Sequence, residues 1–140
     1  MPRHISILFP GQGSQHIGML DNLPTELVES FRGLALQALS FDLIDLIKNG
    51  NEEDLNKTSI TQPAILLTSF IYYKHLQNLT NITADLMCGH SLGEYSALVA
   101  SNSITLDDAL KLVYQRGLLM ERSLKGSMYA ILNTCLLYTS

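Results

Sequence analysis

The 140-residue chain has no tryptophan, only two cysteines and a charged fraction of only 16%. Cys88 and Cys135 are too few for a disulfide framework, and no residue spacing is typical of a metal site. The net charge of −4 offers no basic field, so nucleic acid and anionic membranes are excluded as partners. No apolar run is long enough to span a membrane and no signal peptide begins the sequence, so we expect a cytoplasmic protein. What remains is a globular composition, with 46% hydrophobic residues.

The most informative segment is Gly89-His90-Ser91-Leu92-Gly93, a G-x-S-x-G motif. Residues 82–88 before it are predicted as a strand, and residues 92–100 after it as a helix. A serine at such a turn is exposed on a tight elbow, with the next backbone N–H and the helix N-terminus directed at a developing oxyanion. The motif is also compatible with a turn that merely closes a strand, but the strand–turn–helix context favours a nucleophile.

The N-terminal segment predicts a second part of the same site. Residues 5–9 form a short apolar block that ends at Pro-Gly, as expected of a buried parallel strand. The loop that follows carries Gln12 and Gln15, and sites in parallel sheets lie beyond the carboxyl ends of the strands. A neutral amide at Gln12 can donate an N–H to an oxyanion near Ser91. Taken alone, hydrogen bonding within the loop explains both glutamines better.

A helix over residues 105–121 carries a candidate anion-binding residue. Thr105 and Asp108 resemble a capping box, so the helix is predicted to begin near residue 106. Arg116 falls on its apolar stripe, which consists of Ala109, Leu112, Val113, Gly117 and Met120. The arginine can extend its head to water, form an ion pair with Glu94 or Asp85, or clamp a substrate carboxylate. Spacing alone does not decide among these.

The remaining segments are predicted to be mostly helical. Residues 25–39 are predicted as an amphipathic helix, residues 41–47 as a short apolar helix, and residues 51–59 as a polar surface connection. Thr61 is predicted to cap a further helix with Pro63 in its first turn, continuing to about residue 76.

Four segments together resemble one family of acyltransferases. They are FPGQGSQ near the N-terminus, TQPAI at 61–65, GHSLGEYSALVA at 89–100 and YQRG at 114–117. In this order they are similar to the malonyl-CoA:acyl carrier protein transacylases, which are related to the acyltransferase domains of polyketide synthases. The resemblance implies transfer of a malonyl group from malonyl-CoA to the phosphopantetheine thiol of acyl carrier protein, in fatty acid biosynthesis and without a metal or redox cofactor. The implied partners are malonyl-CoA, coenzyme A and acyl carrier protein.

The same resemblance assigns roles to individual residues. It implies that Ser91 is the nucleophile and that Gln12 and the Leu92 backbone N–H form the oxyanion hole. It also implies that Arg116 binds the malonyl carboxylate, that His90 lines the acyl pocket and that Gln62 lies near the nucleophile as a further substrate-binding residue.

The implied fold is an α/β-hydrolase-like large subdomain with a parallel sheet and flanking helices. It would occupy residues 1–125, with the start of a ferredoxin-like small subdomain at 126–132 and a tail at 133–140 that departs from the family pattern. The family's general base is a histidine in a later segment, so we expect an incomplete chain with little turnover of its own. Two alternatives remain: an esterase or lipase of another G-x-S-x-G family, and a catalytically inactive fragment. An esterase or lipase of this kind requires a Gly-rich HGGG-type loop, which the sequence lacks, and would leave Arg116 without a role.

Overall fold

The computed structural model describes residues 4–80, 82–123 and 126, and it is an α/β arrangement with a small parallel sheet. The strands are β1 (Ser6–Phe9) and β2 (Leu86–Gly89). The helices are α1 (Thr25–Ser30), α2 (Arg32–Leu39), α3 (Leu43–Asn49), α4 (Glu52–Leu55), α5 (Thr58–Leu79), α6 (Leu92–Ala100) and α7 (Leu106–Arg122). None of the helices in these ranges is long and apolar enough to cross a membrane.

The two strands lie side by side in parallel, with Phe9 opposite Gly89 at their carboxyl ends. The Phe9 ring is buried and packs edge-on against Tyr73 of α5, 6.1 Å between centroids. Alternate residues face the other way, and there Leu8 is 74% exposed and Leu86 57% exposed. The sequence predicted a buried strand at residues 5–9, and this is wrong for one face. The described helices cover only the side of the sheet that carries Phe9.

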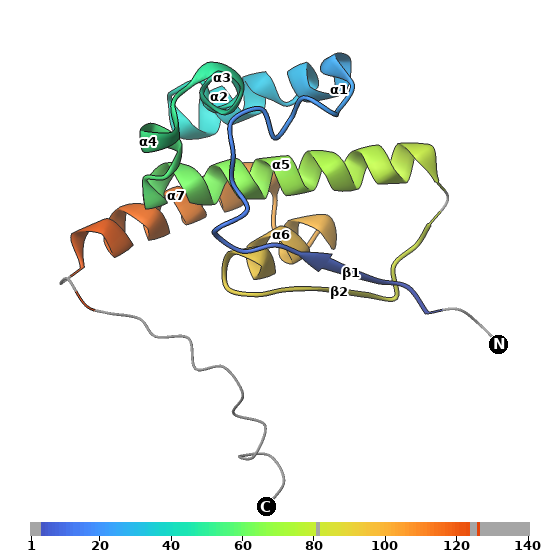
Figure 1. Ribbon diagram of the computed structural model, residues 1–140. Helices are drawn as coiled ribbons and strands as arrows, with labels where there is room; N and C mark the ends of the chain where they lie inside the picture. The colour runs from blue at the N-terminus through green and yellow to red at the C-terminus, as the bar shows by residue number, and fades with distance from the viewer. Residues whose placement is uncertain (1–3, 81, 124–125, 127–140) are drawn as a thin grey trace, which may run out of the picture.

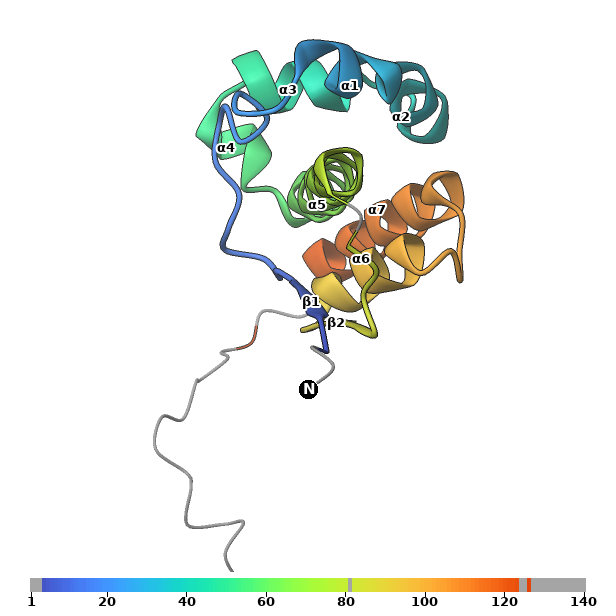
Figure 2. The same cartoon turned by 90° about the vertical axis from the view of Figure 1, so that its right-hand side faces the viewer.

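Helix α5 is the centre of the molecule. It runs between a group formed by α1 to α4 and a second group formed by α6, α7 and the sheet (Figures 1 and 2). Its residues 61–68 are all buried. Large side chains of α5 and of both groups meet here with almost no exposure, and they include Leu66, Leu67 and Ile71 of α5 together with Leu43, Ile44, Ile47, Leu92 and Leu110. This single core holds the two groups in one body.

The N-terminal helices differ from the sequence prediction in their boundaries. The stretch predicted as one helix over 25–39 is two, α1 and α2, which meet at Phe31. The Phe31 ring packs edge-on against Phe70 of α5, 5.8 Å between centroids. The helix predicted at 41–47 is shifted to α3, because the Asp42 side chain caps it by accepting from the Asp45 N–H.

The segment 51–59, predicted as a polar surface connection, contains regular secondary structure. It contains the one-turn helix α4, capped by Asn51 Oδ1, which accepts from the Asp54 N–H at 2.8 Å. Leu55 at its end is buried, which anchors the turn to the core. Helix α5 then begins at Thr58, so Thr61 is not its cap; the Thr61 hydroxyl donates to the Leu55 carbonyl instead. Pro63 accordingly lies inside the helix rather than in its first turn.

Helix α7 begins at Leu106, as predicted, and Thr105 Oγ1 accepts from the Asp108 N–H at 3.1 Å. Its stripe is only partly the predicted one. Leu112 is 50% exposed and Met120 44% exposed, and the buried side is formed by Leu106, Ala109, Leu110, Val113 and Gly117. Ala109, Val113 and Gly117 are thus buried as predicted, and the prediction was wrong for Leu112 and Met120.

Candidate active site

Ser91 occupies a sharp turn between β2 and α6, which confirms the predicted order of strand, turn and helix. The helix has the predicted bounds, whereas the strand predicted at residues 82–88 is shorter and begins at Leu86. The backbone of Ser91 has φ 54° and ψ −105°, a conformation that a residue with a side chain adopts only at a cost of about 1–3 kcal/mol. The serine is exposed, and α6 begins at the next residue, Leu92. Such strain is characteristic of residues that the surrounding structure holds in place for chemistry.

Both glycines of the motif are required by close backbone approach. A Cβ on Gly89 would lie 2.2 Å from the Gly93 carbonyl carbon, and a Cβ on Gly93 would lie 2.3 Å from the Phe9 carbonyl oxygen. No side chain fits at either position, because α6 lies directly on the ends of β1 and β2. The elbow is therefore built from backbone contacts on both sides of Ser91.

The loop after β1 lies beside this elbow. A Cβ on Gly11 would meet the His90 carbonyl oxygen at 3.1 Å, so the chain just before Gln12 runs against the residue just before Ser91. Gln12 is exposed at the same edge of the sheet, and no hydrogen bond of its side chain is found within the described ranges. Gln15 behaves differently: its Oε1 accepts from the Gly13 N–H at 2.8 Å. For Gln15 the loop-bonding alternative is confirmed.

Arg116 reaches Ser91 from α7. Its Nη2 donates to Ser91 Oγ at 3.1 Å, and its Nη1 donates to Gln62 Oε1 at 2.7 Å. The guanidinium carbon also lies 5.6 Å from the centroid of the Tyr95 ring, within range of a cation–π contact. The structure thus brings together three residues that are 29 and 25 positions apart along the chain, namely Gln62, Ser91 and Arg116.

The alternative of a structural ion pair for Arg116 is contradicted. Asp85 is engaged elsewhere, where its Oδ2 accepts from the Ile5 N–H at 2.8 Å. Among the residues that the structure describes, neither Glu94 nor any other carboxylate forms an ion pair with Arg116. Within the described part of the chain, the half-buried cation is held by neutral groups alone.

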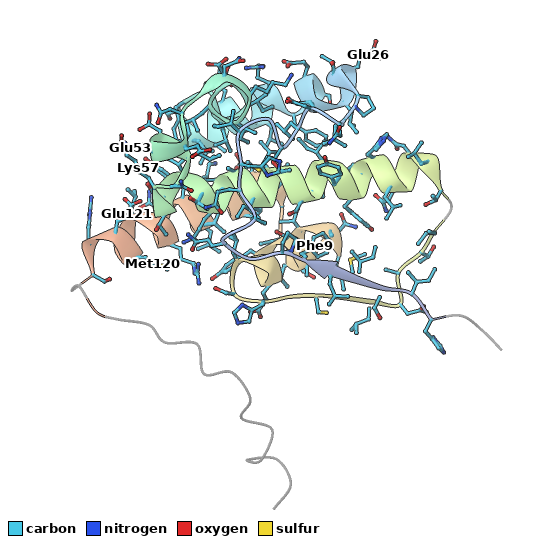
Figure 3. The ribbon with its side chains drawn as sticks, in the orientation of Figure 1. Phe9, Glu26, Glu53, Lys57, Met120 and Glu121 are labelled. Carbon is cyan, nitrogen blue, oxygen red and sulfur yellow. The ribbon has the colours of Figure 1, made fainter. Side chains whose placement is uncertain are left out.

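The close crossing of α5 and α7 fixes the position of the α7 backbone next to Arg116. A Cβ on Gly117 would lie 2.5 Å from the Ser59 Cα, so the two helix backbones touch there. One turn further along α7, Glu121 Oε1 accepts from the Ser59 N–H at 2.7 Å. Figure 3 shows Met120 and Glu121 projecting from the end of α7 beside the start of α5.

Among the described residues, no histidine forms a hydrogen bond with Ser91. His90 is exposed, and within the described ranges the only side-chain hydrogen bond to Ser91 Oγ comes from Arg116. The same ranges contain no cluster of three metal-ligating side chains. The described residues thus bring together a serine, an amide and a cation, and place no base at hydrogen-bonding distance from Ser91.

A hollow of about 440 Å³ opens beside the cation. Arg116 lines it together with Tyr95, Leu112, Gln115, Leu119, Met120 and Ser123. A second hollow, about 510 Å³, lies between β1 and α5 and includes neither Ser91 nor Arg116. Sequence reasoning missed Tyr95, although its position four residues after Ser91 on a predicted helix places the two on one side of that helix.

Comparison with known proteins supports one family. The model of the acyl transferase domain matches residues 7–137. The chain belongs to the acyl transferase domain family. The chain is 44% identical over 137 residues to a malonyl CoA-acyl carrier protein transacylase of Haemophilus influenzae, covering 93% of this chain and 44% of that protein.

Solved structures of this family have the same fold. An acyl carrier protein S-malonyltransferase of Vibrio cholerae superposes with a TM-score of 0.83 at 42% identity, covering 88% of this chain and 41% of that one. A malonyl-transacylase solved in complex with a type II polyketide acyl carrier protein gives a TM-score of 0.80 at 45% identity, covering 85% and 39%. The chain thus spans less than half the length of the relatives that it matches.

Proposed function

We propose that this chain forms the nucleophile-bearing part of a malonyl-CoA:acyl carrier protein transacylase. The observation that carries the proposal is the hydrogen bond between Arg116 and Ser91, which sets a cation without a carboxylate partner at a strained serine. An acyl group with a free carboxylate fits this arrangement, because a carboxylate in a pocket costs several kcal/mol unless a cation pairs with it. An esterase for neutral substrates has no use for such a cation.

The proposed reaction has two acyl transfers. Ser91 Oγ attacks the thioester carbonyl of malonyl-CoA, and the coenzyme A thiolate leaves with the electron pair of the C–S bond. The thiol of the carrier protein's phosphopantetheine then attacks the acyl-serine and releases the Ser91 hydroxyl. The tetrahedral oxyanion of each step would accept hydrogen bonds from the Leu92 N–H and the Gln12 amide. Thioesters are already activated, so the proposed steps use no metal or redox cofactor.

The proton of Ser91 needs a base, and the family resemblance assigns this role to a histidine in a later segment that the 140 residues do not include. The finer fold assignment belongs to the same proposal. Residues 1–125 would form the larger, α/β-hydrolase-like subdomain. The expected start of a ferredoxin-like subdomain at 126–132 and the tail at 133–140 lie, apart from residue 126, outside the described residues.

The named relatives point to the same substrates. The Haemophilus influenzae protein is named for malonyl-CoA and acyl carrier protein, and one solved relative is in complex with a carrier protein. We propose both as partners of this chain. A catalytically inactive binding role is the second candidate, and the lack of a described base at Ser91 favours it for the chain on its own.

The test measures binding and acyl-enzyme formation separately. Calorimetry with malonyl-CoA and acetyl-CoA reports selectivity, and intact-mass spectrometry with peptide mapping reports an acyl group on Ser91. We expect preferential binding of malonyl-CoA, and any malonyl adduct should be absent from Ser91→Ala. Arg116→Ala should weaken malonyl-CoA binding by about 2–4 kcal/mol and change acetyl-CoA binding little.

The matched control is Arg122→Ala, which removes an exposed arginine from the last turn of the same helix. It should leave both affinities unchanged. Equal losses for malonyl-CoA and acetyl-CoA in Arg116→Ala would make Arg116 structural and would contradict the proposal. A wild-type chain that does not prefer malonyl-CoA would also contradict it.

A further inference from the structure

Gln62 is the one amide buried completely at the site, with 0% of its surface exposed. Its Oε1 accepts from Arg116 Nη1 at 2.7 Å, and its Nε2 donates to Met120 Sδ at 3.2 Å. Both partners lie on α7, while Gln62 lies on α5. The amide therefore joins the two helices at the point where Arg116 leaves α7 for Ser91.

The chemistry of the two partners fixes the orientation of the amide. A guanidinium has only donors, so it must face the amide oxygen. A thioether can only accept, so it takes the amide NH₂. If the amide were reversed, its NH₂ would face the N–H groups of Arg116, and its oxygen would face the sulfur of Met120. Neither pair could form a hydrogen bond. Gln62 is therefore held in one orientation, with its oxygen toward the guanidinium.

The charge around Arg116 is unlike that around most other cations of the structure. Arg32, Lys48, Lys57 and Lys111 each form an ion pair with a carboxylate. The contacts found for Arg116 within the described ranges are an amide oxygen, a hydroxyl and an aromatic ring. Each of them orients the guanidinium without cancelling its charge.

We propose that Gln62 is a positioning residue that determines specificity for an anionic acyl group. Its buried amide holds Arg116 toward Ser91 through a neutral acceptor, so the positive charge stays available to a substrate carboxylate. A glutamate at this position would hold the arginine equally well but would itself occupy the cation as a buried ion pair. The inference rests on the proposed function and assigns to Gln62 a role through Arg116 rather than contact with the acyl group.

Three substitutions separate orientation from charge. Gln62→Glu keeps an acceptor and adds a negative charge, whereas Gln62→Met keeps the approximate volume and removes the acceptor. Thr61→Val is the control, because Thr61 is buried on the same turn of α5 but its hydroxyl donates to Leu55 rather than to the site. The readouts are the ratio of malonyl-CoA to acetyl-CoA affinity by calorimetry, and the Arg116 side-chain N–H signals in ¹⁵N NMR spectra.

Gln62→Glu is expected to lower the malonyl-to-acetyl affinity ratio by roughly 10- to 100-fold, while the Arg116 signals stay as sharp as in the wild type. Gln62→Met should lower the ratio less and broaden or shift those signals, because the guanidinium loses its acceptor. Thr61→Val should lower the melting temperature and leave the ratio unchanged.

The result that would overturn the inference is a wild-type preference for malonyl-CoA that Gln62→Glu retains. Unchanged Arg116 signals in Gln62→Met would equally overturn it. If the wild-type chain shows no malonyl preference, the proposed function itself fails. In that case the Arg116 signals of Gln62→Met still test whether Gln62 positions the guanidinium.

Discussion

The Phe9 carbonyl oxygen lies where a Cβ on Gly93 would come within 2.3 Å of it, so β1 and α6 meet backbone to backbone. This contact places the end of β1 against the first turn after Ser91. We predict that Gly93→Ala destabilises the fold by about 1–3 kcal/mol or more, because neither backbone can give way. Urea unfolding followed by circular dichroism measures the change.

The control for this prediction is Gly33→Ala. Gly33 is exposed inside α2, and nothing lies within 4 Å of the site of an added Cβ. Alanine there should stabilise the protein by about 0.5–1 kcal/mol, since glycine is the poorer helix former. Equal effects of the two substitutions would contradict the account of the elbow.

The positive φ of Ser91 leads to a second prediction. Ser91→Gly should be more stable than Ser91→Ala by about 1 kcal/mol, because glycine adopts φ 54° without the steric cost that a Cβ brings. Both variants should lack an acyl-serine. Thermal unfolding of the pair gives the difference, and an alanine variant as stable as the glycine variant would mean that the turn carries no strain.

The exposed face of the sheet predicts self-association. Leu8 and Leu86 lie on this face at 74% and 57% exposure, and contiguous apolar surface of this kind promotes association. The double variant Leu8→Lys, Leu86→Lys should stay monomeric at higher protein concentration, with a free energy of unfolding within about 0.5 kcal/mol of the wild type. Light scattering after size-exclusion chromatography measures the mass. Leu79→Lys, which removes an exposed leucine away from the sheet, should have a smaller effect.

The ion pair between Glu29 and Arg32 predicts a pH dependence. The hydrogen bond from Arg32 lowers the pKa of Glu29 from its usual value of 4.5 to about 2. A carboxyl whose pKa is lowered by folding stabilises the protein above its unfolded pKa, and this contribution is lost as the pH falls through the folded value. The melting temperature of the wild type should therefore exceed that of Glu29→Gln above pH 5.

The two melting temperatures should converge between pH 4.5 and about 2, where Glu29 becomes protonated in the folded protein. Glu26→Gln is the control, since Glu26 forms no ion pair within the described ranges. A difference between wild type and Glu29→Gln that persists unchanged at pH 2 would argue against the ion pair.

Local signals in the sequence predicted the parts of the site that local geometry determines. The glycines around Ser91 and the Thr105 cap each act within a few residues, so the elbow and the start of α7 were predicted at the correct positions. The partner of Arg116 was not predictable in this way. Glu94, Asp85 and a substrate all suited the spacing, and only the packing of α7 on α5 brings Gln62 to the guanidinium.

The errors in the predicted elements have a common physical origin. Helix α4 is one turn of mostly polar residues, so it has no apolar period to detect, and its place is set by burial of Leu55. The stripe of α7 was predicted correctly at Ala109, Val113 and Gly117, but Leu112 and Met120 were wrongly included, because helix packing buries Leu110 instead. In both cases tertiary contacts outweighed the local pattern.

The approach of Gly117 to Ser59 also restricts how this sequence can change over evolutionary time. The atoms that a new Cβ would meet include the Cα and backbone nitrogen of Ser59, which every amino acid possesses. A substitution that only shortens a side chain on α5 therefore does not make room for a larger residue at position 117. Such a residue requires the two helix backbones to move apart here, and this movement would also shift the arginine one residue earlier.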